Sequence, residues 1–235
     1  MNKRFHSLIV LWMIGAALLL TGCGRELQQR HAFIGFLQKE VIPRNSGLII
    51  PTKTMRKKFG EYAPHSDVIV DFNATMHEIV GKPLDRLQRD FAEAMKPEAG
   101  VKERKAATTK YMASLAEIGQ ALDTELALTE EKIAALQQPN ELKAVFTQAV
   151  DKHVRLPAHT LKSMVPATNE MLKKNLALLD FVLANKGKIL IKDGMIQVTD
   201  QSTLSRLNQM QADIAKTAQA IQAQHNAFIQ QASRK

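Results

Sequence analysis

Residues 101–138 read VKERKAATTKYMASLAEIGQALDTELALTEEKIAALQQ, and they predict the first long helix of this chain. Apolar or small residues recur along the stretch in alternating steps of three and four, the spacing of one helix face. This seam comprises Met112, Leu115, Gly119, Leu122, Leu126, Thr129, Ile133 and Leu136. Gly119 and Thr129 are the two weak positions of this seam, because neither has a large apolar side chain. Pro139 ends the helix because proline lacks the backbone N–H that a helix interior requires.

A second long helix is predicted near the end of the chain, over residues 202–232. Its seam comprises Leu204, Leu207, Gln211, Ile214, Ala218, Ile221, His225 and Phe228. At about 1.5 Å per residue, each long helix would reach roughly 45–55 Å. Gln211 and His225 are polar residues in this seam, and we interpret them as hydrogen-bonded register positions. A buried polar switch or a partner contact is the alternative.

Shorter helices and one hairpin complete the predicted fold. Breaks are expected at Gly81-Lys82-Pro83, Pro157 and Pro166, because proline disfavours helix at and just before its position. Residues 188–198 predict a β-hairpin around Asp193-Gly194, a pair that suits a type I′ turn. An isolated hairpin is marginally stable, so this one should pack on helices. The fold class is therefore mainly α: an elongated helical bundle with two long amphipathic helices and one small β-hairpin.

The amino-terminal residues predict a lipoprotein signal peptide over 1–22. Lys3 and Arg4 precede an uncharged apolar run of thirteen residues, 8–20, whereas spanning a bilayer takes about 20. The run ends in Leu20-Thr21-Gly22-Cys23, which looks like a lipobox. Cleavage is expected after Gly22, and Cys23 is the expected lipidation site. The alternative is an ordinary signal peptide cut near Gly22, with Cys23 left as a free thiol.

The position of the cysteine supports the lipobox, because Cys23 is the only cysteine in 235 residues. Resemblance to bacterial lipoproteins implies three acyl chains on this residue, each palmitate-like chain contributing about 0.8 kcal/mol per buried CH₂. Gly24 follows the cysteine instead of the aspartate that usually retains lipoproteins in the inner membrane. The resemblance therefore implies the outer membrane, with the protein on its periplasmic face. We expect a lipidated tether over 23–30 and one helical periplasmic domain over 31–235.

Composition narrows the classes of partner. The formal charge is +9, and removing Lys3 and Arg4 with residues 1–22 leaves +7, which favours an anionic neighbour. Lys53, Arg56, Lys57 and Lys58 form a basic cluster that could meet an anionic surface, although a solvated helix face explains it as well. The chain ends in Arg234-Lys235, and Lys235 is a candidate for covalent attachment to the cell wall. An ordinary frayed basic end is the alternative. Nucleic acid is not expected for an exported chain.

The sequence shows no catalytic or metal-binding pattern. The histidines outside the signal peptide are His31, His65, His77, His153, His159 and His225, and no pair of them has zinc-site spacing. A Gly-x-Ser-x-Gly nucleophile motif and a glycine-rich phosphate loop are also missing from the sequence. We therefore expect neither an enzyme nor a cofactor.

The chain resembles a known group of proteins in four segments that follow the lipobox. They are residues 29–38 (QRHAFIGFLQ), 57–60 (KKFG), 142–149 (LKAVFTQA) and 224–228 (QHNAF). These segments are similar to the YiaF-like uncharacterised lipoproteins of enteric bacteria, a family defined as a domain of unknown function. The resemblance implies a largely helical periplasmic lipoprotein and supplies no catalytic residues.

Two functional hypotheses follow from these observations. The first is a non-enzymatic lipoprotein that binds another envelope component, such as a protein or peptidoglycan, through its helical body. The second is a binder of a lipid or cell-wall ligand in a groove between the helices and the hairpin. The second hypothesis predicts a deep apolar pocket with inward basic groups. The sequence leaves the oligomeric state open.

Overall fold

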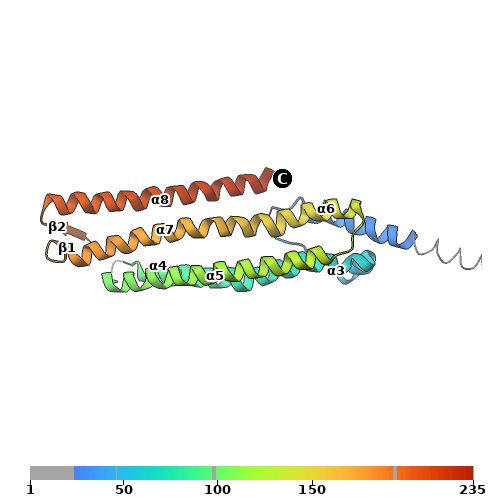
Figure 1. Ribbon diagram of the computed structural model, residues 1–235, viewed down its shortest axis with the longest axis horizontal. Coiled ribbons are helices and arrows are strands. Elements are labelled where there is room, and N and C mark those ends of the chain that lie inside the picture. The colour runs from blue at the N-terminus through green and yellow to red at the C-terminus, as the bar shows by residue number, and fades with distance from the viewer. Residues whose placement is uncertain (1–23, 46, 97–98, 193–194, 235) are drawn as a thin grey trace, which may run out of the picture. The chain divides into compact units, whose positions relative to one another are not determined.

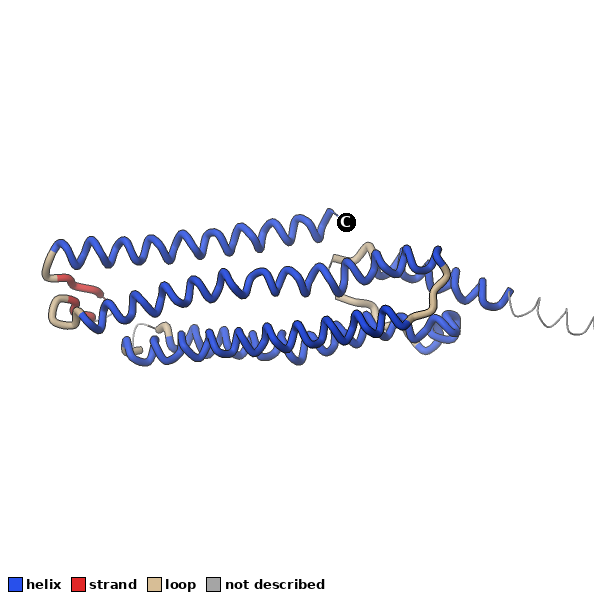
Figure 2. The backbone as a smooth tube through the Cα atoms, in the orientation of Figure 1, coloured by secondary structure: helices blue, strands red, loops and turns tan. Residues whose placement is uncertain are grey.

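The computed structural model describes residues 24–45, 47–96, 99–192 and 195–234. The predicted signal peptide, Cys23, the Asp193-Gly194 turn and Lys235 lie outside the described residues. The described chain is mainly α-helical with one antiparallel pair of strands, so the predicted fold class is confirmed (Figures 1 and 2). In the ranges described, no helix is long and apolar enough to cross a membrane.

The elements follow one another with few loops. A helix over 24–36 leads directly into the π-helical turn η1 (Leu37–Val41). Then come α2 (Lys53–Phe59), η2 (Gly60–Tyr62), α3 (Ala63–Met76), η3 (His77–Gly81), α4 (Lys82–Ala94), α5 (Val101–Ala135), α6 (Asn140–Val150), η4 (Asp151–Arg155), α7 (Leu156–Ala184), β1 (Ile189–Lys192), β2 (Met195–Val198) and α8 (Gln201–Arg234). The segment 24–30, which we expected to be a tether, is thus helical.

The chain divides into two compact units. The amino-terminal unit comprises Met1–Asp71 and Glu131–His153, and the carboxy-terminal unit comprises Phe72–Glu130 and Val154–Lys235. Helices α3 and α5 and the turn η4 continue through the boundaries between the units. The single domain predicted over 31–235 stays a prediction.

Each described π-helical turn ends two residues before a proline. The turns η1, η3 and η4 precede Pro43, Pro83 and Pro157 respectively. A proline removes a backbone donor and its ring crowds the carbonyl four residues earlier. Widening the preceding turn relieves that crowding, and the N–H of Lys82 bonds the carbonyl of His77 five residues back. The breaks predicted at Gly81-Lys82-Pro83 and at Pro157 are therefore wrong, because the helix widens there instead of ending.

The break predicted at Pro166 is wrong for a different reason. Helix α7 runs through this residue without interruption. Pro166 leaves the carbonyl of Lys162 without its helical donor. Both residues have exposed side chains on the same side of the helix, where water can bind that carbonyl. The chain consequently has a third long helix, of 29 residues, beside the 35-residue α5 and the 34-residue α8.

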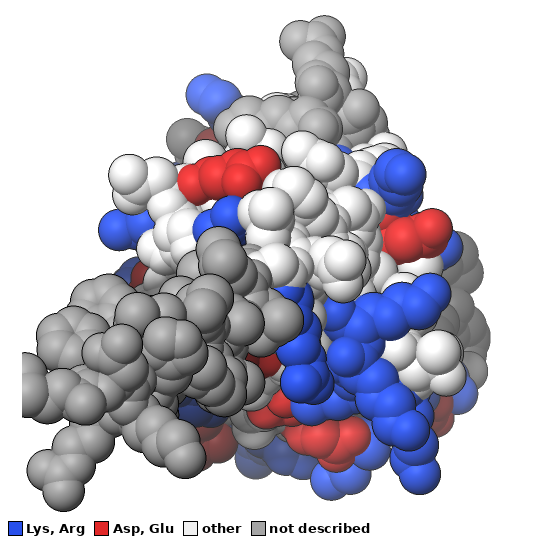
Figure 3. All heavy atoms as spheres, turned by 90° about the vertical axis from the view of Figure 1, so that its right-hand side faces the viewer, with Lys and Arg blue, Asp and Glu red and all other residues white. Residues whose placement is uncertain are grey.

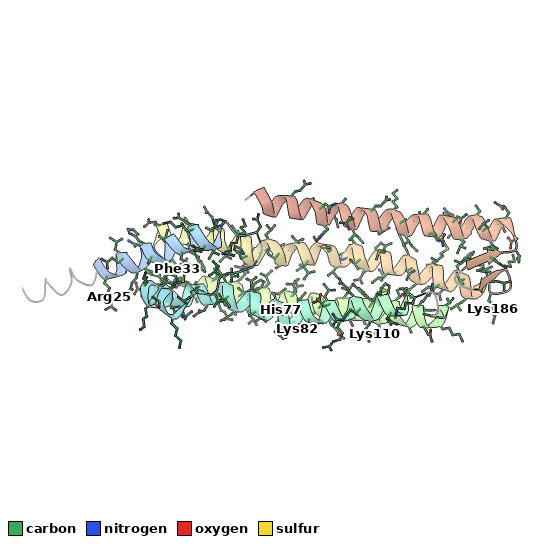
Figure 4. All side chains as sticks on the ribbon, turned by 180° about the vertical axis from the view of Figure 1, so that it is seen from behind. Arg25, Phe33, His77, Lys82, Lys110 and Lys186 are labelled. Atoms are coloured by element: carbon green, nitrogen blue, oxygen red, sulfur yellow. The ribbon has the colours of Figure 1, made fainter. Side chains whose placement is uncertain are left out.

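Aromatic rings form the core of the amino-terminal unit. Phe33, on the helix over 24–36, has no exposed surface and contacts Phe59, with ring centroids 5.2 Å apart (Figure 4). Phe36 contacts the same ring at 5.2 Å, and Phe146 of α6 lies 6.4 Å from Phe33. Rings at these separations bury large areas and add a small specific attraction. This cluster fixes the first described helix against α2 and α6.

Gly60 is required where the chain leaves α2. Its φ of +55° and ψ of −120° suit only glycine, and an added Cβ would lie 2.0 Å from the Gln29 side chain. Gly60→Ala is therefore expected to lower the free energy of unfolding by about 1–3 kcal/mol, measured by urea denaturation. Gly119→Ala is the control, because its Cβ would meet no atom within 4 Å. Alanine in that helix interior should stabilise by about 1 kcal/mol. A Gly60→Ala protein as stable as the wild type would contradict this role.

In the carboxy-terminal unit, the buried face of α5 is rotated relative to the predicted seam. The buried residues are Thr108, Tyr111, Leu115, Ile118, Leu122 and Thr129. Only Leu115, Leu122 and Thr129 belong to the predicted set. Tyr111 faces Phe91 of α4, with ring centroids 4.9 Å apart, and Thr108 accepts a hydrogen bond from Asn175 of α7. Because α5 packs against two neighbours, its buried face is wider than a single seam.

The hairpin lies between α7 and α8 in the chain and packs on both, as predicted. Its strands pair Ile189 with Val198, and Ile189 is buried with Val182 of α7 and Leu207 of α8.

Helices α7 and α8 then run side by side (Figure 1). Two predicted seam positions of α8 are wrong: Gln211 and Ala218 are exposed, whereas His225 is half-buried. Met210 and Thr217 are half-buried instead, and Thr217 accepts a hydrogen bond from Lys174 of α7.

Candidate functional site

A cavity of about 450 Å³ opens in the amino-terminal unit. Its lining comes from η2, from the first turn of α3 and from the segment that joins α5 to α6: Glu61, Tyr62, His65, Gln137, Gln138 and Pro139. The volume falls in the range of sites for small ligands. Pro139 keeps this joining segment out of a helix, so the last residues before it face the start of α3.

His65 is buried in this pocket, with 6% of its surface exposed. Its ring packs edge-on against Phe33, Tyr62 and Phe146, with centroid distances of 5.4–6.1 Å. Nε2 lies 3.4 Å from the carbonyl oxygen of Gln137. Burial lowers the pKa of His65, while the Gln137 carbonyl and the Glu61 carboxylate oppose that shift. His65 is therefore neutral near pH 7, with Nε2–H as the donor and Nδ1 as an acceptor.

Two buried polar atoms of the pocket side chains have no hydrogen-bond partner within the described residues. They are Nδ1 of His65, an acceptor, and Nε2 of Gln138, a donor. A buried polar group left without a partner costs about 1–3 kcal/mol. Such groups are uncommon in native structures and point to a role beyond packing. Their occurrence together in the lining of one cavity makes this pocket the candidate functional site.

The first described helix holds one wall of the pocket in place. The Tyr62 hydroxyl donates to the Glu26 carboxylate, and the backbone N–H of Glu61 donates to Oε1 of Gln29 at 3.4 Å. Burial, together with the Glu26 carboxylate, raises the pKa of Tyr62. Glu26 follows Cys23 by three residues, and three residues of chain span at most about 11 Å. The wall of the pocket is thus joined to a residue that follows the predicted lipidation site by three positions.

The predicted basic cluster lies on α2, in the same unit. Lys53, Lys57 and Lys58 are exposed, whereas Arg56 donates to both carboxylate oxygens of Asp67. That pairing raises the pKa of Arg56 and satisfies its charge within the protein. On the face drawn in Figure 3, Lys and Arg side chains gather in one area beside fewer acidic groups. Three of the four predicted cations are consequently available to an anionic surface.

Cys23, Gly22 and Lys235 lie outside the described residues. None of the pocket residues comes from the hairpin, which we expected to border a ligand groove. A second cavity of about 440 Å³ lies between α4 and α5, with an apolar floor that includes Leu87 and Phe91. Across the described ranges, no three His, Cys, Asp or Glu side chains are placed to hold a metal ion.

Sequence reasoning missed the pocket. His65 and Gln137 are 72 residues apart, and Gln138 is an ordinary polar residue at a helix end. One local signal was available: Gln137 and Gln138 precede Pro139, and a proline leaves nearby helix-end groups without intrahelical partners. It did not indicate which residue would approach them.

His65 gives the folded protein a pH dependence. Burial holds its pKa below the ordinary value of 6.5, so the unfolded chain takes up the proton first as the pH falls. The stability that neutral His65 contributes is full above about pH 6.5 and decreases as the pH falls toward the folded-state pKa. Urea midpoints measured at pH 7.5 and pH 5 should therefore differ less in His65→Gln than in the wild type. The exposed His31→Gln is the matched control. An unchanged difference in His65→Gln would contradict this assignment.

Comparison with known proteins supplies a family. A profile described as "Protein of unknown function (DUF3053)" matches residues 8–230. The chain is 28% identical over 232 residues to the uncharacterized protein YiaF of Escherichia coli strain K12, covering 97% of this chain and 93% of the relative. Uncharacterized YiaF proteins of Escherichia coli O157:H7 and Shigella flexneri match to the same extent. No solved structure matches significantly. The family resemblance read from the sequence is confirmed: the chain belongs to the DUF3053 family of proteins of unknown function.

Proposed function

We propose that this chain is a lipoprotein anchored through Cys23 to the periplasmic face of the outer membrane, and that its helical body binds another envelope component. The lipobox at residues 20–23 is the observation that carries the proposal. Three acyl chains hold a protein on a membrane far more firmly than the single chain that binds only marginally. Gly24 favours the outer membrane as the destination.

The contacts of the first described helix support a body held close to the membrane. Arg30 pairs with Glu26 at 3.5 Å and lies 3.8 Å from Glu141 of α6. With the Phe33 cluster, these contacts join the helix to the rest of the unit from residue 26 onward. A short, structured connection of this kind restricts the distance at which a partner can be met.

The exposed lysines of α2 suit an anionic neighbour. Lys53, Lys57 and Lys58 would each gain about 1 kcal/mol beside a negatively charged membrane surface. Arg56 contributes less because Asp67 already neutralises it. Covalent attachment of Lys235 to peptidoglycan is a separate proposal. Boiling cells in detergent tests it: the attached protein would remain on the sacculus, and an unattached one would enter the soluble fraction.

The binding of a small lipid or wall ligand is a second candidate function. The 450 Å³ pocket with its two unpartnered atoms favours it over a purely structural role. The described lining of the pocket is both polar and apolar, and it includes no basic side chain. It therefore differs from the apolar groove with inward basic groups that we expected, and the class of ligand must differ as well.

Photocrosslinking in living cells tests the leading proposal. A photoreactive residue placed at Lys57 of α2 should give one or two discrete adducts with other envelope components. The same residue placed at Lys216, an exposed lysine of α8, is the comparison. Discrete adducts from either position support a binding body. Unmodified protein or a continuous smear of random neighbours from both positions would count against it.

A further inference from the structure

The pocket at Glu61, Tyr62, His65 and Gln138 offers a ligand more hydrogen-bond acceptors than donors. Nδ1 of neutral His65 is an unpartnered acceptor. The Glu61 carboxylate is a second acceptor, close enough to interact electrostatically with both His65 and Tyr62. Nε2 of Gln138 is an unpartnered donor. A ligand that satisfies this set supplies several N–H or O–H donors and one nearby acceptor.

The charge of the pocket selects against anions. Among the described residues, its lining contains a carboxylate and no lysine or arginine. A phosphate or carboxylate placed there would meet Glu61 without a compensating cation, which is unfavourable. A cation would gain a charge-assisted hydrogen bond from Glu61.

The unpartnered nitrogen of His65 distinguishes between kinds of cation. A primary ammonium carries three N–H donors and can satisfy Nδ1 of His65 and Glu61 together. A quaternary ammonium carries none, and proteins bind it with cages of aromatic rings. Tyr62 is the only phenyl-type ring among the described residues of this lining. The pocket therefore suits a primary ammonium.

We infer that this pocket binds the primary ammonium of an aminophospholipid headgroup, with Glu61 and His65 accepting its N–H groups and Gln138 donating to a phosphate ester oxygen. The specificity for a primary ammonium is inferred from the lining residues alone and does not depend on the proposed anchoring. The lipid as its source rests on the proposed anchoring, since the Tyr62 wall contacts Glu26, within about 11 Å of chain from Cys23. A headgroup in the same leaflet is then always near.

Histidine side-chain NMR tests the inference on the processed protein, purified from membranes in detergent and labelled with ¹⁵N-histidine. Ethanolamine and dihexanoyl phosphatidylethanolamine should each shift the Nδ1 resonance of His65, because this nitrogen accepts a new hydrogen bond. Choline and dihexanoyl phosphatidylcholine, which lack N–H groups, should leave that resonance in place. Equal shifts from the choline compounds, or no shift from the ethanolamine compounds, would overturn the inference.

Substitutions in the pocket test which side chains contact the ligand. Glu61→Gln should weaken the binding of ethanolamine, and Gln138→Ala should weaken the binding of dihexanoyl phosphatidylethanolamine, each about tenfold. Gln148→Ala, an exposed glutamine substitution on α6 of the same unit, is the matched control and should leave binding unchanged. Equal affinities in all three variants would overturn the assignment of these groups.

A further probe separates the sources of the ammonium. Alanine amide carries a primary ammonium beside a carbonyl, as a peptide end does. If it shifts His65 at concentrations where the ethanolamine compounds do not, the ligand is a peptide amine and the lipid source is wrong. A processed protein that lacks acyl chains on Cys23 but still responds to ethanolamine would overturn the proposed anchoring while retaining the ammonium specificity.

Discussion

Replacing Cys23 with alanine is expected to abolish the incorporation of labelled palmitate and to release the chain from the outer membrane. No second cysteine can accept the lipid, because Cys23 is the only one in the sequence. Three chains with about 0.8 kcal/mol per buried CH₂ would be lost, far more than any surface contact could replace. Labelling with palmitate followed by separation of the two membranes measures both effects.

Gly24→Asp is the matched control for this experiment. It leaves Cys23 and the lipobox intact, so palmitate incorporation should persist. The protein should then stay in the inner membrane, since aspartate after the lipidated cysteine usually retains lipoproteins there. Continued palmitate labelling of the Cys23→Ala protein would contradict the assignment of the anchor.

Replacing Phe33 with alanine should destabilise the folded protein by about 3–5 kcal/mol. Phe33 is fully buried and contacts the rings of Phe59, His65 and Phe146, so its removal leaves a cavity at the centre of the amino-terminal unit. The loss should appear as a lower urea midpoint. His65 should also become more exposed, because one of its packing partners is gone.

Leu27→Ala is the control on the same helix, because Leu27 is 40% exposed. That substitution should change stability by about 0.5 kcal/mol or less. If the two variants had equal effects, Phe33 would not be the centre of the core. The comparison also tests whether residues 24–36 belong to the folded body instead of forming a loose tether.

Sequence periodicity predicted the long helices and the position of the hairpin, but not the helical structure of residues 24–30. It was less accurate about how helices continue and which face they bury. Pro83, Pro157 and Pro166 indicated breaks, yet the helices absorb them through π-helical turns or an exposed carbonyl. The buried side of α5 depends on contacts with both α4 and α7, which a pattern within one segment does not contain.

The pocket, like the buried face of α5, depends on contacts that form only when the chain folds. A motif search examines residues at short spacing, and it indicated a lipobox at residues 20–23. His65 and Gln138 become interesting only because folding buries them together without partners. In the sequence, His65 is one of six histidines outside the predicted signal peptide, and no spacing rule distinguishes it.

The intact mass of the protein extracted from membranes tests the central proposal most directly. We predict a chain that begins at Cys23 and carries the added mass of a diacylglycerol and a further acyl group, lost in the Cys23→Ala variant. A mature chain that begins elsewhere, or one that begins at Cys23 with a free thiol, would contradict a lipid-anchored protein.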